Sequence, residues 1–158
     1  MESERLARLC FEAGRDPDAI TFCVAAPFYI TDGTVSALEH ARNQSRWFGG
    51  MVGNHVADMV KRYGEDASKV PQVLSDYIRA REGYDYDHHG KADNPSTDFV
   101  PDEIVDRFCV LGTTDQHIEK LLLLEEMGVD HFGIYLMHDD REGTLRAYGE
   151  TIIPKING

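Results

Sequence analysis

The segment from 82 to 100 holds the densest group of side chains that could do chemistry in this sequence. Two tyrosines alternate with aspartates there, and two adjacent histidines and a lysine follow them. The aromatic rings could stack on a flat ligand, and the basic groups could hold an anionic tail or a substrate. A solvent-exposed loop of mixed charge would have the same composition, so both interpretations stay open. The candidate residues are Tyr84, Tyr86, His88, His89 and Lys91.

Two further candidates follow apolar runs that are typical of strands. Gly112 and Thr113 begin a predicted helix, where free backbone N–H groups suit an anion such as a cofactor phosphate. Thr113 and Gln116 also form the pattern of an ordinary capping box, which needs no ligand. His138 follows the last predicted strand and could face a substrate or lie in a solvated turn.

Other kinds of site find little support. Asp85, Asp87, His88 and His89 could bind a metal in principle, but adjacent histidines rarely point the same way, and no spaced pair of cysteines or His-Glu-x-x-His motif is present. We therefore expect no metal site. The sequence also lacks a Gly-x-Ser-x-Gly motif, a P-loop and a Gly-x-Gly-x-x-Gly motif, so hydrolase, NTPase and Rossmann functions are not indicated.

The elements that must position these candidates alternate between strand and helix. Apolar runs rich in β-branched and aromatic residues predict strands at 20–30, 108–111 and 131–137. Helical periodicity predicts helices at 3–13, at 34–80 in pieces broken by Gly49-Gly50, at 101–107, at 113–127, and in a last segment that ends at Pro154. This alternation predicts an α/β fold with parallel strands.

Several motifs in this order resemble the luciferase-like oxidoreductase family. The last two strand–helix units carry a turn of the Val-x-Gly-Thr type, a Gly-Val-Asp turn and a closing proline, as that family does. Other segments are similar to its deazaflavin-dependent branch, the methylene-tetrahydromethanopterin reductases. The matching segments are 47–51, 53–56, 84–86, 88–91, 99–102, 108–113, 126–130 and 148–154.

The resemblance implies the fold and the cofactor. It predicts the C-terminal portion of a TIM (β/α)8 barrel, about three parallel βα units in a single domain spanning 1–158. A whole barrel typically needs about 250 residues, so we expect this chain to be inactive alone. The implied cofactor is FMN or the deazaflavin coenzyme F-420, used for monooxygenation or hydride transfer. In the family, the segment before the penultimate strand is an active-site lid, which corresponds here to 84–91. A non-catalytic flavin-binding or assembly module derived from the same fold is the alternative.

Composition limits the partners. The 158 residues carry a formal charge of −12, which disfavours nucleic acid and anionic lipid. Three widely spaced cysteines (Cys10, Cys23 and Cys109) and a polar start without an apolar run predict a cytoplasmic protein. We expect a small-molecule substrate. We also expect a homo-oligomer or a companion chain that completes the barrel.

Overall fold

The computed structural model describes residues 2–63, 97 and 100–157. Its centre is a three-stranded sheet made of β1 (Cys23–Ile30), β2 (Val110–Gly112) and β3 (His131–Tyr135). Both neighbouring pairs are parallel, with Phe28 opposite Val110 and Cys23 opposite His131. The predicted α/β class and the three parallel strands are therefore confirmed.

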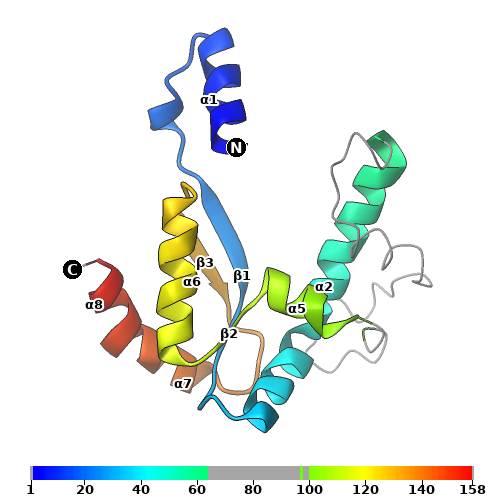
Figure 1. Cartoon of the computed structure of the whole chain (residues 1–158), viewed down its shortest axis with the longest axis vertical. Helices are drawn as coiled ribbons and strands as arrows, with labels where there is room; N and C mark the ends of the chain where they lie inside the picture. Colours follow the sequence, from blue (N-terminus) through cyan, green and yellow to red (C-terminus); the bar gives the residue numbers. More distant parts are fainter. Residues whose placement is uncertain (1, 64–96, 98–99, 158) are drawn as a thin grey trace.

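The order of the strands across the sheet is β2-β1-β3. The strand that comes first in the chain therefore lies in the middle, as Figure 1 shows. In a (β/α)8 barrel, successive strands are neighbours, so the last three strands of a barrel would place the second one in the middle. One side of β2 and one side of β3 consequently have no strand partner among the described residues.

Helix α2 (Val35–Tyr63) runs without interruption through Gly49-Gly50, so the predicted break there is wrong. Both glycines are buried. A Cβ added at Gly49 would lie 3.0 Å from Cγ1 of Val100 and 3.4 Å from Cγ2 of Ile104. The missing side chain thus allows helix α5 (Asp102–Phe108) to pack closely on α2. The predicted helical piece after Pro71 lies outside the described residues.

Two other helices lie before and within the sheet's strand order. Helix α1 (Glu2–Glu12) precedes the sheet, and a short 3₁₀ turn, η1 (Pro17–Ala19), connects it to β1. Helix α6 (Thr114–Glu126) joins β2 to β3 and has the predicted capping box at Thr113. The chain reverses after α6 at Gly128, whose φ of 90° suits a residue without a side chain.

The end of the chain contains α7 (Arg141–Ala147), a π-helical segment, η4 (Tyr148–Ile152), and α8 (Ile153–Ile156). The prediction that Pro154 ends the helix is wrong, since it lies in the first turn of α8. Proline has no backbone N–H to donate to the preceding turn, and a first helical turn tolerates that loss. The wider π-helical turn just before it absorbs the change in hydrogen bonding.

The core lies between the sheet and the helices on either side. Phe28 of β1 is fully buried, and its ring contacts the rings of His117, Phe132 and Tyr148. The remaining buried core side chains come chiefly from α2, α5 and α6, and they include Trp47, Phe48, Ile104, Val105, Ile118 and Leu121. Among the described helices, none is long and apolar enough to cross a membrane.

Candidate functional site

The carboxyl ends of the three parallel strands meet at one edge of the sheet, which is where α/β proteins place their active sites. Three of the predicted site residues lie at this edge. Gly112 and Thr113 end β2, and the backbone N–H of Thr31 donates to the carbonyl of Gly112 at 2.7 Å. His138 follows β3, and its ring lies 4.5 Å from that of Tyr29 on β1. Tyr84, Tyr86, His88, His89 and Lys91 lie outside the described residues.

The turn at Gly112 and Thr113 is occupied by its own capping group. The backbone N–H of Thr113 donates to Oε1 of Gln116 at 2.9 Å, and the N–H of Gln116 donates to Oγ1 of Thr113 at 3.4 Å. The amide of Thr113 is thus already paired. An anion at this turn would have to displace the Gln116 side chain.

His138 is a buried polar residue, only 3% exposed. Neither ring nitrogen makes a hydrogen bond of normal geometry with a described residue. Burial lowers the pKa of His138, although the charges of Asp139 and Asp140 and the backbone of Phe28 oppose that shift. We therefore place a neutral imidazole against the ring of Tyr29.

Asp139 connects three elements at this edge. One carboxylate oxygen accepts a hydrogen bond from the hydroxyl of Tyr29, on β1, at 2.8 Å. The other lies 2.8 Å from Nε2 of His40, on α2. The backbone N–H of Asp139 donates to Oε1 of Gln44, also on α2, at 3.2 Å. The loop after β3 is therefore fixed to both the central strand and the long helix.

Opposing effects set the ionisation of this group. Partial burial raises the pKa of Asp139, but hydrogen bonds from Tyr29 and His40 and the charge of His40 outweigh it, so the net direction is downward. The pKa of the Tyr29 hydroxyl is raised by burial, by its hydrogen bond to Asp139 and by nearby carboxylate charge. Near neutral pH the pair therefore consists of a carboxylate and a protonated tyrosine.

Sequence reasoning did not single out Tyr29, His40 or Asp139. Tyr29 lies at the carboxyl end of a strand and Asp139 follows one, and in α/β proteins such positions often carry functional residues. His40 gives no such signal, because it lies within a helix and meets Asp139 only through the fold.

A second histidine that the sequence did not indicate, His117, is fully buried below this edge. Its Nε2 lies 3.1 Å from the carbonyl of Tyr29, and its Nδ1 lies 2.8 Å from the hydroxyl of Tyr148. Because the carbonyl can only accept, Nε2 carries the proton and the hydroxyl of Tyr148 donates to Nδ1. Burial lowers the pKa of His117 to about 4, so the ring is neutral.

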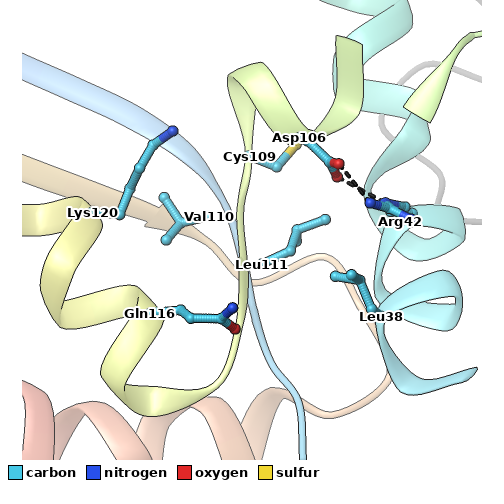
Figure 2. A pocket seen from close by; sticks show the side chains of 8 residues that line it. All are labelled: Leu38, Arg42, Asp106, Cys109, Val110, Leu111, Gln116 and Lys120. Carbon is cyan, nitrogen blue, oxygen red and sulfur yellow. Dashed lines mark hydrogen bonds and ion pairs between the residues drawn. The ribbon is translucent and has the colours of Figure 1, made fainter. Parts of the chain in front are cut away.

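Two of the hollows that the described residues form lie beside the sheet, away from this edge. Figure 2 shows the first, of about 280 Å³, beside the unpaired side of β2. Arg42 lies in it, but both arms of its guanidinium are bound to Asp106, at 2.8 and 2.6 Å. Lys120 also lines it, and no carboxylate of the described residues pairs with this lysine. A second hollow, of about 350 Å³, has a mainly apolar lining that includes Phe132, Ile134 and Ile152. Neither hollow includes a predicted site residue.

Comparison with known proteins decides the family. The family model described as luciferase-like monooxygenase matches residues 2–131, most of the chain. The chain belongs to this family. Neither the curated proteins nor the solved structures contain a match to it.

Membership of the luciferase-like monooxygenases indicates a flavin-dependent oxidoreductase at the level of the family. Luciferase-like proteins generally use a flavin or a deazaflavin. The described residues do not form a complete cradle for such a group, because the amide of Thr113 is occupied and neither hollow reaches the strand ends.

Proposed function

We propose that this chain is the carboxy-terminal part of a flavin- or deazaflavin-dependent oxidoreductase of the luciferase-like family. The observation that carries the proposal is the family match over residues 2–131. The parallel sheet with polar residues at its carboxyl edge supports it. The parent reaction would be hydride transfer or monooxygenation on a small molecule, with FMN or coenzyme F-420 as the cofactor.

The finer assignment to the end of a (β/α)8 barrel is part of this proposal. It draws support from the number and direction of the strands, since the described residues hold three parallel strands and a barrel has eight. In that arrangement β1, β2 and β3 would be successive neighbours. The observed order, β2-β1-β3, differs from that succession. We also propose that the protein is cytoplasmic, which agrees with three cysteines that form no disulfide.

The cofactor assignment is testable by direct binding. Purified protein is mixed with FMN or with coenzyme F-420, and the change in the visible absorbance of the ring is titrated. Saturable binding of one of the two supports the proposal and selects the cofactor. No binding of either, by the chain or by its complex with any companion chain that copurifies, would overturn it.

The segment 84–91 gives a sharper version of the same test. If His89 and Lys91 hold the anionic tail, His89→Ala and Lys91→Ala should each weaken binding, because each removes a charged or hydrogen-bonding partner. Asp66→Ala is the matched control and should leave the affinity unchanged. Unchanged affinity in both loop variants rejects the assignment of this segment.

One observation favours a second candidate, a non-catalytic binding or assembly module. Both outer strands have a side without a strand partner among the described residues, and such edges pair readily with other chains. Binding of the cofactor without turnover, in the presence of a reductant and oxygen, would favour this candidate over the enzyme.

A further inference from the structure

We propose that His40, Asp139 and Tyr29 form a hydrogen-bonded group at the carboxyl edge of the sheet, in which Nδ1 of His40 is an activated base that accepts a hydrogen bond from the hydroxyl of a small neutral ligand. The site does not depend on a flavin or deazaflavin, so it goes beyond the family-level function proposed above.

The position of Asp139 decides which nitrogen of the His40 ring carries the proton. Its Nε2 lies 2.8 Å from Oδ2 of Asp139. An ionised carboxylate can only accept, so Nε2 must carry the proton. In the neutral form of the ring, the lone pair lies on Nδ1, to which no described residue is bonded. This is the orientation that a histidine needs in order to act as a general base.

Asp139 is itself held in place by a second hydrogen bond. Its other oxygen accepts from the hydroxyl of Tyr29 at 2.8 Å, and the Tyr29 ring is only 8% exposed. The Tyr29 ring is held between the rings of His40 and His138, whose centres lie 5.8 and 4.5 Å away. Asp139 and Tyr29 are therefore positioning residues, and the carboxylate makes Nδ1 of His40 a stronger hydrogen-bond acceptor.

The exposure of His40 and the charges around it limit the kind of ligand that can bind. The side chain of His40 is 49% exposed, so a ligand can reach it, whereas Tyr29 and His138 are buried behind it. The charged groups beside this histidine pair are the carboxylates of Asp139 and Asp140 and the guanidinium of Arg141, which donates to the carbonyl of His138. With two negative charges against one positive, a neutral ligand is favoured over a carboxylate or phosphate directly at His40. A neutral molecule with a hydroxyl group suits the site.

Diethyl pyrocarbonate tests the state of His40 without requiring the natural ligand. A neutral imidazole nitrogen attacks one carbonyl carbon of the reagent, a carbon–nitrogen bond forms, and ethyl carbonate leaves. The rate at each histidine is followed by peptide mass spectrometry. We expect His40 to react faster than His131, which is also exposed but has no carboxylate partner among the described residues. Equal or slower reaction at His40 would overturn the proposal.

Asp139→Asn separates an acid–base role from a structural one. The amide nitrogen of asparagine would donate to Nε2, which shifts the ring proton to Nδ1 and removes the lone pair. We expect the rate at His40 to fall by at least about tenfold, because the altered tautomer carries no lone pair on Nδ1. The rate at His131 should stay the same. If Asp139 only anchors the loop, its loss exposes His40 and raises the rate, which would contradict the proposal.

Hydrolysis of p-nitrophenyl acetate gives a second measurement on folded protein. His40→Gln should lower the rate about a hundredfold if Nδ1 is activated, the lower end of the range known for general bases. His131→Gln is the matched control and should retain the rate of the original protein. Tyr29→Phe removes the hydroxyl that positions Asp139, so the rate should fall, but by less than in His40→Gln, and circular dichroism checks the fold of each variant. An equal loss in the His40 and His131 variants would overturn the proposal.

Discussion

His117 illustrates how one buried residue can make stability depend on pH. Its side chain is fully buried, and its pKa is lowered to about 4 from an ordinary value of 6.5. As the pH falls below 6.5, the unfolded chain takes up a proton at this position, whereas the folded chain does so only near pH 4. Stability is therefore full above pH 6.5 and falls between 6.5 and 4. The gap corresponds to about 3 kcal/mol.

Urea unfolding at pH 7 and pH 4.5 measures this effect. We expect the free energy of unfolding to fall more in the original protein than in His117→Gln, which has no proton to take up in this range. His131→Gln, at an exposed position, should behave like the original protein. Equal pH dependence in the original protein and the His117 variant would contradict the prediction.

Gly112 is a second position at which a single added carbon atom should change the stability of the protein. Its φ is 140°, a backbone conformation that side chains disfavour, and an added Cβ would collide with Oε1 of Gln116. Gly112→Ala should cost about 1–3 kcal/mol and loosen the start of α6. Gly149→Ala is the control, since nothing lies within 4 Å of its added Cβ, and it should be neutral or slightly stabilising. Thermal unfolding of both variants makes the comparison, and similar Tm values would be evidence against this role.

At the scale of elements, a ladder of charged side chains fastens α5 to α2. Arg42 binds Asp106 through two nitrogens, and Arg46 binds Asp102 at 2.6 Å as well as the carbonyl of Val100. Only 14% of the Arg46 side chain is exposed. This ladder and the close approach at Gly49 determine where α5 leads the chain into β2.

Arg46→Met tests the ladder. It leaves the buried carbonyl of Val100 and part of Asp102 without their partner, so we expect a loss of about 1–3 kcal/mol. Arg146→Met removes an exposed pair with Glu142, four residues apart in α7, and should cost no more than about 0.5 kcal/mol. Chemical denaturation of the two variants provides the measurement. A loss in the Arg46 variant as small as in the Arg146 variant would show that the ladder adds little.

The strands and helices also show how much of the fold and of the candidate site could be predicted from the sequence. Apolar runs located all three strands, and the capping box at Thr113 was visible directly, because both depend on neighbouring residues. Gly49-Gly50 gives the same local pattern whether it breaks a helix or lets another helix approach, and only the packing against Val100 distinguishes the two. The pairing of His40 with Asp139 joins residues far apart in the chain, so no local pattern could predict it.

At the scale of the whole molecule, β3 is covered less than a parallel strand usually is. None of its five residues is buried, and Phe22, just before β1, is 40% exposed. Parallel sheets are normally covered on both faces. Burying apolar surface gains about 25 cal/mol per Å², so a few hundred Å² would supply several kcal/mol towards association. On the basis of this exposed apolar surface, we propose that the chain associates with a second copy or with a companion chain.

Sedimentation at micromolar concentration tests that proposal. We expect a species larger than the 17.8 kDa chain. Tyr135→Lys should weaken the association, because a lysine on an edge strand opposes pairing with another strand. Leu145→Lys, at an exposed position on α7, is the control and should not. A well-folded monomer of the original protein would show the proposal to be wrong.

The central place of β1 has a consequence for the way the protein folds. Among the described strands, both partners of β1 follow it much later in the chain, since Phe28 pairs with Val110 and Cys23 with His131. Contacts so distant in sequence are slow to form, because a long loop must close before any pairing is gained. Until Val110 and His131 are synthesised, β1 lacks the two described strands that pair with it, and its apolar surface is open to aggregation. We therefore expect slow refolding and a dependence on chaperones during synthesis.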